Sequence, residues 1–209
     1  MARYIDPVCR QCRRVGEKLF LKGERCYTPR CAVERRRRPP GDHAPRRRRP
    51  SDWSLQLKEK QKARFSYGVL ERQFRNYFEK ARERPGKTGD NLLQILESRL
   101  DNVVYRLAFV DSRRQGRQMV THGHFTVNGR RVNIPSYLVK QDDVIAWKAA
   151  NGSVPEFVKA LTDGLPKRPV PFWLRLDTDT LTGQVATLPD PSEMQSGIDV
   201  RLIVEFYSK

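Results

Sequence analysis

The sequence has few apolar residues and no long hydrophobic run. Hydrophobic residues make up 38% of the 209 residues, and no apolar stretch approaches the roughly 20 residues that a membrane-spanning helix needs. The start, Met1-Ala2-Arg3-Tyr4, is not followed by the apolar segment of a secretory signal. Ala2 also stands where N-myristoylation requires glycine. We therefore expect a cytoplasmic protein with no membrane attachment.

Acidic residues are outnumbered by basic ones. The chain has 41 Lys+Arg against 24 Asp+Glu, which gives a formal net charge of +17. So large an excess repels itself and disfavours a compact chain unless a polyanion neutralises it. Because a membrane partner is not indicated, the charge predicts binding to nucleic acid.

Cysteine is absent after Cys31, and the four cysteines present follow the spacing Cys9-x2-Cys12-x13-Cys26-x4-Cys31. In a reducing compartment, clustered cysteines favour a metal over disulfides. Two close pairs separated by a loop provide four soft ligands for one tetrahedral ion. We predict one structural Zn²⁺, because four thiolates leave no open coordination position for catalysis. An iron–sulfur cluster, which also uses four thiolates, is the alternative.

Residues 1–50 are predicted to form a metal-bound knob followed by a basic arm. Apolar residues are almost absent beyond Val33, so we expect this zone to have no core of its own. Structural zinc supplies roughly 10–16 kcal/mol of binding free energy that becomes folding free energy. The blocks Arg35–Arg38 and Arg46–Arg49 predict an arm that orders on RNA. A disordered basic tail is the alternative.

Residues 51–97 are predicted to form a helical domain. Ser51 or Asp52 is a suitable N-cap for a first helix, which Gly68 ends. A third helix is expected from Thr88, after Pro85-Gly86. The second helix has apolar residues at helical spacing on one face, namely Leu70, Phe74, Tyr77, Phe78 and Ala81.

Residues 98–195 are predicted to form an α/β module with an antiparallel sheet. Ser98 with Asp101, and Ser112 with Gln115, fit capping boxes that begin two helices. Asn128-Gly129 is a strong hairpin signal because both residues tolerate positive φ. Strands are expected at Val144–Trp147, Trp173–Leu176 and 183–188, with a turn at Asp177–Thr180. The last segment, 196–209, fits the period of a strand as well as that of a helix. The fold class is therefore α+β.

Several segments are familiar. Ser98–Leu107, Ser112–Arg114 with Arg117-Gln118, and Val127–Val132 resemble the small RNA-binding module named after ribosomal protein four of the small ribosomal subunit. The cysteine cluster after Ala2-Arg3-Tyr4, and the stretches Leu57–Lys62, Glu71–Asn76 and Ile203–Lys209, resemble that ribosomal protein family itself. The resemblance covers nearly the whole chain and indicates the bacterial, cysteine-containing, zinc-binding form of the family.

The resemblance implies a structural component of the small ribosomal subunit. Such a protein binds 16S rRNA directly, nucleates assembly of the 5′ domain, lies near the path by which mRNA enters the subunit, and affects translational accuracy. The implied partners are 16S rRNA, mRNA and small-subunit ribosomal proteins five and three, and no homo-oligomer is expected. The resemblance also favours a helix at 196–209 that packs on residues 51–97.

Arginine suits this role, because its planar fork grips phosphate with two hydrogen bonds. The N-terminus of the helix from Ser112 offers free N–H groups to phosphate, and Arg113 and Arg117 share one face of that helix. The full set of predicted RNA-binding residues is Arg3, Arg10, Arg13, Arg14, Arg35, Arg36, Arg46, Arg47, Arg48, Arg49, Lys58, Lys60, Arg64, Arg72, Arg75, Arg113, Arg114, Arg117, Gln118, His122, His124, Asn128, Arg130 and Arg131.

Two other classes of protein are less well supported. Pseudouridine synthases and a tRNA synthetase carry a similar module, but they need a catalytic domain that the remaining chain is too short to form. Asp177 and Asp179 have the pattern of turn residues, so we predict that the protein is not an enzyme. A zinc-finger DNA-binding regulator would place a recognition helix after the cysteines, where this chain has arginine and proline.

Overall fold

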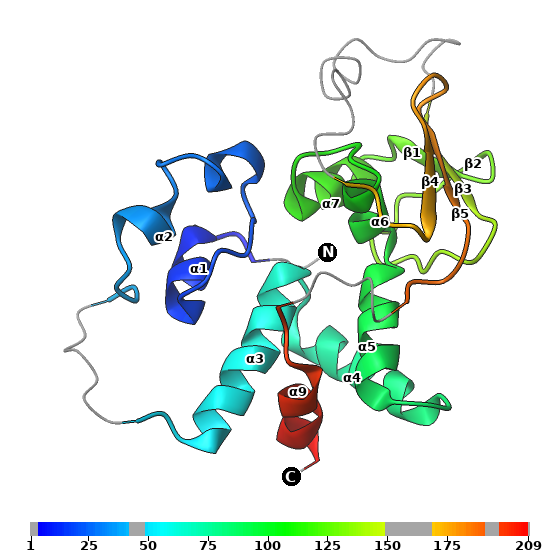
Figure 1. The fold of residues 1–209 in the computed structure, drawn as a ribbon. Coiled ribbons are helices and arrows are strands. Elements are labelled where there is room, and N and C mark those ends of the chain that lie inside the picture. Colours follow the sequence, from blue (N-terminus) through cyan, green and yellow to red (C-terminus); the bar gives the residue numbers. More distant parts are fainter. Residues whose placement is uncertain (1–3, 42–48, 149–168, 191–196, 209) are drawn as a thin grey trace. The chain divides into compact units, whose positions relative to one another are not determined.

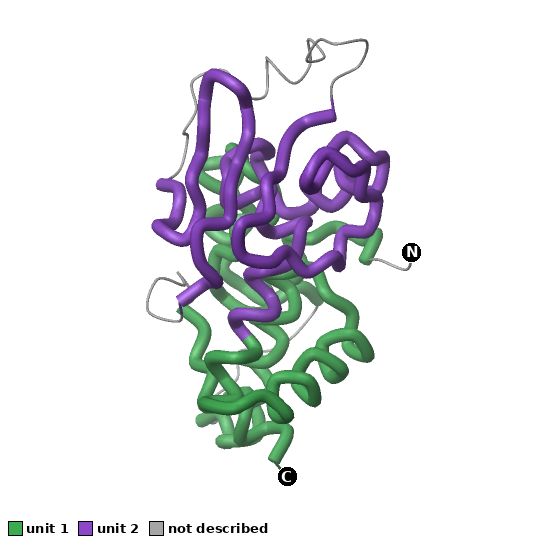
Figure 2. Tube along the Cα trace, turned by 90° about the vertical axis from the view of Figure 1, so that its right-hand side faces the viewer, with its two compact units in different colours: residues 1–92, 195–209 green, residues 93–194 purple. Residues whose placement is uncertain are grey.

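The computed structural model describes residues 4–41, 49–148, 169–190 and 197–208 (Figure 1). It combines helices with a five-stranded antiparallel sheet, which confirms the α+β prediction. The chain divides into two compact units, residues 1–92 with 195–209, and residues 93–194 (Figure 2). The boundary lies inside a helix, five residues before the predicted one, and the cysteine-containing segment belongs to the first unit together with the predicted helical domain.

The first unit begins with α1 (Cys9–Val15), the 3₁₀ turn η1 (Gly23–Cys26) and α2 (Ala32–Arg35). A small core joins these elements, made of Val8, Cys12, Val15, Leu19 and Leu21, with Val33 and Phe65 packed against it. The expectation that residues 1–50 have no core of their own is therefore wrong. The apolar residues that form this core lie before Val33, among the cysteines.

Three helices follow, α3 (Asp52–Ser66), α4 (Glu71–Glu83) and α5 (Thr88–Glu97). The Ser51 hydroxyl accepts a hydrogen bond from the Ser54 N–H at 3.4 Å, which confirms the predicted cap. Gly68 has a φ of +63° just after α3, where a Cβ would be strained. The predicted apolar face of α4 is buried except for Leu70, which precedes the helix and is 38% exposed.

The C-terminal segment forms the helix α9 (Val200–Tyr207), which packs beside α3 (Figure 1). The Tyr207 ring stacks on Phe78 of α4, with ring centroids 4.6 Å apart. The Asp199 carboxylate accepts a hydrogen bond from the Arg201 N–H and caps the helix at 3.0 Å. The helical alternative for this segment is therefore confirmed.

The second unit contains α6 (Leu100–Arg106), α7 (Arg113–Thr121) and five strands. The strands are β1 (Phe125–Val127), β2 (Arg130–Arg131), β3 (Val144–Trp147), β4 (Leu174–Asp177) and β5 (Thr182–Val185). Their order is β2-β1-β3-β5-β4, with every neighbouring pair antiparallel. Asn128 and Gly129 have φ of +50° and +76° between β1 and β2, which confirms the predicted hairpin.

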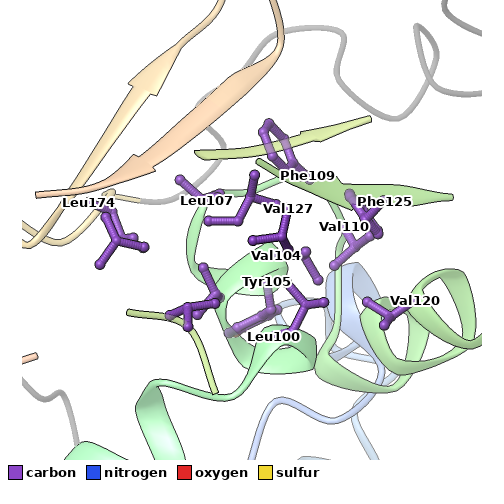
Figure 3. Packing of buried hydrophobic residues seen from close by; sticks show 14 of the residues in the cluster. Leu100, Val104, Tyr105, Leu107, Phe109, Val110, Val120, Phe125, Val127 and Leu174 are labelled. Carbon is purple, nitrogen blue, oxygen red and sulfur yellow. The ribbon is translucent and has the colours of Figure 1, made fainter. Parts of the chain in front are cut away.

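One core lies between these helices and the sheet (Figure 3). Leu100 and Val104 of α6 and Leu107 just after it belong to the same core as Phe125 and Val127 of β1, and all five are at most 4% exposed. This core fixes α6 on the sheet, and it is the frame on which the surface described below is built.

The capping box predicted at Ser98 is wrong. The Ser98 hydroxyl instead donates to the Gln94 carbonyl at 2.7 Å, and Arg99 precedes the first turn of α6. The Asp101 carboxylate accepts hydrogen bonds from the Arg99 side chain. At α7 the predicted cap is confirmed, because the Ser112 hydroxyl accepts from the Gln115 N–H at 3.3 Å.

Candidate nucleic-acid interface

The helix α7 lies close against α6 because Gly116 stands at their contact. A Cβ on Gly116 would lie 2.8 Å from the Asp101 carbonyl oxygen and 2.9 Å from a Val104 methyl group. Only glycine therefore permits this approach without displacement of a helix. The same packing leaves Arg114 and Gln118 exposed on the other side of α7.

Arg113 and Arg117 share a face of α7, but that face is turned towards α6. Arg113 Nε donates to Asn102 Oδ1 at 2.7 Å, and its guanidinium carbon lies 4.5 Å from the Tyr105 ring centroid. Arg117 Nη1 lies 3.2 Å from Asp101 Oδ2. The two side chains are only 16% and 14% exposed. Helical periodicity places the two side chains on one face, but it does not distinguish an ion-paired face from a solvated one.

Beneath α7 lies a network of buried charges that the sequence analysis missed. Arg99 is fully buried and binds Asp101 through two hydrogen bonds, Nε to Oδ1 at 3.0 Å and Nη2 to Oδ2 at 2.6 Å. Arg106 binds Glu97 in the same forked manner at 2.9 and 2.6 Å, and Asn102 donates to Glu97 Oε2 at 2.6 Å. The alternation Glu97-x-Arg99-x-Asp101 beside buried leucines was the available signal.

Within the described residues, the arginines of this network outnumber its carboxylates. The ion pairs join four arginines, Arg99, Arg106, Arg113 and Arg117, to the two carboxylates of Glu97 and Asp101. Charge in a poorly hydrated setting acts at longer range than charge in water. The α6–α7 surface is therefore positive even where its arginines are ion-paired.

The β1–β2 hairpin continues this surface. Arg130 and Arg131 are exposed on β2, and His122 is exposed at the end of α7. Asn128 has another role, since its side-chain Nδ2 donates to Asp143 Oδ1 at 2.8 Å and its side-chain Oδ1 accepts from the Val144 N–H at 2.9 Å. Asn128 is exposed and anchors the hairpin to β3, and its contact with RNA stays a prediction.

Comparisons with known proteins agree with this geometry. Residues 3–97 match the family described as the ribosomal protein S4/S9 N-terminal domain, and residues 98–145 match the S4 domain. Over the full length of both chains, the protein is 56%, 54% and 53% identical to the small ribosomal subunit protein uS4 of Ruminiclostridium cellulolyticum, Pelotomaculum thermopropionicum and Thermus thermophilus, respectively. The chain belongs to the ribosomal protein uS4 family.

Membership of the uS4 family makes the chain a structural, rRNA-binding protein of the small ribosomal subunit and not an enzyme. The turn at Asp177 agrees with this, because its carboxylate accepts from the N–H groups of Asp179 and Thr180 at 3.0 and 3.2 Å. No helix within the described residues has the length and apolar character to cross a membrane.

The first unit of this uS4 chain carries a second set of basic residues. The exposed members of the predicted set are Arg10, Arg14, Arg35, Arg36, Arg49, Lys58, Arg72 and Arg75. Arg13 instead holds the basic arm, since its guanidinium donates to the carbonyls of Arg38 and Pro39 at 2.9 and 3.2 Å. The predicted residues Arg3, Arg46, Arg47 and Arg48 lie outside the described residues.

Lys60 and Arg64 are held by Glu71. Lys60, with 6% of its side chain exposed, lies with Nζ 2.7 Å from Glu71 Oε1 and 4.8 Å from the Phe206 ring centroid. Arg64 Nε is 3.6 Å from Glu71 Oε2 and donates to Gln61 Oε1 at 2.8 Å. The RNA-contact prediction for Lys60 is therefore replaced by a structural role.

The charges around Glu71 shift two pKa values in the first unit. Burial opposes ionisation of Glu71, but hydrogen bonds from Lys60 and Tyr207 and the charges of Lys60 and Arg64 outweigh it, so its pKa lies below the ordinary value. Burial and the Glu71 charge raise the pKa of Tyr207 well above its usual range, and the Tyr207 hydroxyl donates to Glu71 Oε1 at 3.0 Å. This cluster ties α3, α4 and α9 together.

The four cysteines lie in α1, in η1 and just before α2. Cys12, Cys26 and Cys31 are buried, Cys9 is half-buried, and burial raises the pKa of the Cys12 and Cys26 thiols. The charges of the other three cysteines act on the Cys12 thiol, and the Lys22 N–H donates to Cys26 Sγ at 3.3 Å. Among the described residues, no group of three or more His, Cys, Asp or Glu side chains is arranged to hold a metal ion. Four thiols are nevertheless the donor set that structural zinc uses.

Proposed function

We propose that this protein binds 16S rRNA through the exposed side of α7 and the β1–β2 hairpin. The observation that carries the proposal is the positive charge of the α6–α7 network, in which, among the residues that the structure describes, four arginines share two carboxylates. Arg114 and Gln118 project beside it, and Arg130 extends the surface on the hairpin. Arg113 and Arg117, which are ion-paired on the α6 side of α7, add positive charge to this surface. The proposed contacts are therefore Arg114, Gln118, His122, His124, Arg130 and Arg131.

The first turn of α7 suits a phosphate group. It contains no acidic residue, and its N–H groups and helix dipole place partial positive charge beside Arg114. Double-stranded RNA is recognised by proteins mainly through phosphate and shape. A surface of arginine forks on a rigid helix fits that mode of recognition.

The basic residues of the first unit form a second proposed contact with the same rRNA. Arg10 and Arg14 are exposed on α1, and Arg72 and Arg75 are exposed on α4. We propose that Arg35–Arg38 and Arg46–Arg49 bind phosphates as an arm that orders on RNA. The tether that Arg13 makes to the carbonyls of Arg38 and Pro39 supports a defined start for this arm.

We also propose that Cys9, Cys12, Cys26 and Cys31 bind one structural Zn²⁺, with an iron–sulfur cluster as the alternative. Support comes from the donor set, from the mutual influence of the four thiols and from the N–H group of Lys22 directed at Cys26 Sγ. Such N–H donors stabilise a thiolate ligand and orient it. The metal would hold α1, η1 and α2 together in addition to the small core.

The finer position in the ribosome is likewise proposed. The full-length similarity to uS4 relatives supports a protein that nucleates assembly of the 5′ domain and lies near the path by which mRNA enters. The proposed protein partners are small-subunit proteins five and three, through which the chain would affect translational accuracy.

Salt dependence of rRNA binding tests the interface. Affinity for a transcript of the 16S 5′ domain is measured by filter binding at several salt concentrations. The slope of the logarithm of the binding constant against the logarithm of the salt concentration is negative. Arg114→Ala and Arg130→Ala should each reduce its magnitude by about 0.7–0.9, the contribution of one phosphate contact. Arg201→Ala, which removes an exposed arginine from α9, is the charge-matched control. Equal slopes for all three variants and the unmodified protein would contradict the proposed surface.

A further inference from the structure

Arg131 is held flat over the end of α7 instead of extending freely from the hairpin. Its Nη2 donates to the His122 carbonyl at 3.1 Å. A Cβ on Gly123 would overlap the Arg131 guanidinium, so the guanidinium rests where a side chain would otherwise stand. Gly123 also has a φ of +74°, which L residues rarely adopt. The position of Arg131 thus depends on position 123, which only glycine can fill for two reasons: the space that the guanidinium occupies and the positive φ.

Two histidines, His122 and His124, flank Gly123 at this end of α7. The ring centroids of His122 and His124 are 6.0 Å apart with an interplanar angle of 54°, and the Arg131 charge acts on His124. The backbone that carries them is fixed, because the His124 N–H donates to the Met119 carbonyl at 3.1 Å and its carbonyl accepts from the Lys148 N–H at 2.7 Å. The two imidazoles therefore stand on one fixed segment between α7 and β1, and Arg131 of β2 is hydrogen-bonded to the backbone of that segment.

This arrangement suits the face of a base better than a phosphate. The C-terminal end of a helix carries partial negative charge, which disfavours an anion. Arg131 already directs one of its N–H groups to the carbonyl of His122 at that end. Burial, with the charges of His122 and Arg131, lowers the pKa of His124, which disfavours a charge on its ring. An imidazole ring and the plane of a guanidinium are both surfaces on which unpaired RNA bases stack.

We infer that His122, His124 and Arg131 form a stacking site for one unpaired nucleobase of structured RNA. The inference rests on the proposed rRNA-binding function and adds a base contact to its phosphate contacts. Gly123 is a positioning residue, since it leaves room for the guanidinium. His122 and Arg131 are exposed and offer their faces to the base, whereas His124 is half-buried and supports them from the sheet side.

The test compares stacking with charge in the full-length protein. Affinity for the transcript of the 16S 5′ domain is measured at pH 7.5 over a range of salt concentrations. His122→Ala and Arg131→Lys should each weaken binding roughly 5- to 150-fold, the loss of one stacked base, with no change in salt slope. His122→Phe keeps an aromatic face and should remain within about threefold of the unmodified protein, because stacking does not require imidazole. Arg175→Lys, at an exposed position of β4, is the matched control for the replacement of an arginine. Melts followed by circular dichroism check that each variant is folded.

Each other result has one meaning. Arg131→Lys binding as tightly as the unmodified protein would overturn the inference, because lysine keeps the charge and loses the plane. A slope lowered by about 0.7–0.9 in His122→Ala, with His122→Phe equally weak, would indicate a phosphate contact and also overturn it. Failure of the unmodified protein to bind the transcript would reject the proposed function itself, which separates the two failures.

Discussion

Asp101 binds Arg99, a fully buried arginine, and replacement of Asp101 tests the network beneath α7. Its carboxylate binds the fully buried Arg99 through two hydrogen bonds and also accepts from Arg117 at 3.2 Å. Asp101→Asn keeps the shape of the side chain and removes the negative charge. Arg99 then keeps its charge in the interior but loses the carboxylate that binds it through two hydrogen bonds.

The expected loss of stability is large. Breaking a buried ion pair by removing one partner destabilises a protein by about 3–5 kcal/mol, because the other charge is left uncompensated. For a chain of this length, each kcal/mol lowers the melting temperature by about 2–4 °C. Asp101→Asn should therefore melt roughly 6–20 °C below the unmodified protein.

Thermal melts followed by circular dichroism measure this effect. Glu79→Gln is the matched control, because its partner Arg75 is 70% exposed and the pair lies on the surface of α4. An exposed pair of this type contributes only about 0.3–0.5 kcal/mol. The control should accordingly melt within about 2 °C of the unmodified protein.

A double variant separates charge burial from shape. Arg99→Met with Asp101→Leu removes both charges, and apolar replacement of a whole buried pair is often neutral. The double variant should thus be more stable than Asp101→Asn alone. If Asp101→Asn melted like the Glu79→Gln control, or if the double variant were the less stable of the two, uncompensated charge would not be the cause and the reasoning would be refuted.

Three further predictions concern other parts of the fold. Gly116→Ala should destabilise the protein by about 1–3 kcal/mol in urea melts, because the new methyl group presses on the Asp101 carbonyl and Val104; no loss would mean that α6 and α7 separate freely. The depressed pKa of Glu71 contributes stability above the ordinary carboxylate pKa, and this is lost as pH falls through the depressed value. Melts over a range of pH should therefore show that the stability of Glu71→Gln falls less on acidification than that of the unmodified protein. An unchanged dependence of stability on pH would contradict this role. Chelation, or Cys26→Ser, should render residues 1–35 sensitive to protease while the rest stays resistant, and equal resistance with and without metal would count against the zinc proposal.

The predictions that held depend on short stretches of chain. The Asn128-Gly129 turn needs two adjacent residues with positive φ, and the buried face of α4 needs apolar residues three and four apart. The cap at Ser112 joins residues three apart. Each of these choices is settled by backbone sterics or by a hydrogen bond within one turn, so it can be read from the sequence alone.

The predictions that failed concern partners far apart in the chain. Lysine is usually exposed at the surface, yet the ring of Phe206 covers Lys60 and Glu71 binds it. Helical periodicity does not say which way Arg113 faces, whereas its hydrogen bond to Asn102 of the neighbouring helix turns it inward. A solvated arginine and an ion-paired arginine have the same charge and can occupy the same place in the helical repeat. Only the packing of α6 on α7 distinguishes them.

The sequence by itself determined the family resemblance, the helices and strands from residue 51 to 188 in their order, and the positive charge that requires a nucleic-acid partner. The tertiary structure decided how α1, η1 and α2 share a small core, which arginines face outward, whether 200–207 is a helix, and how Gly123 makes room for the Arg131 guanidinium. The physical reason is that local conformational preferences act over a few residues. The free energy of burying a charge or a ring depends instead on neighbours as distant as Glu71 and Tyr207, which are 136 positions apart.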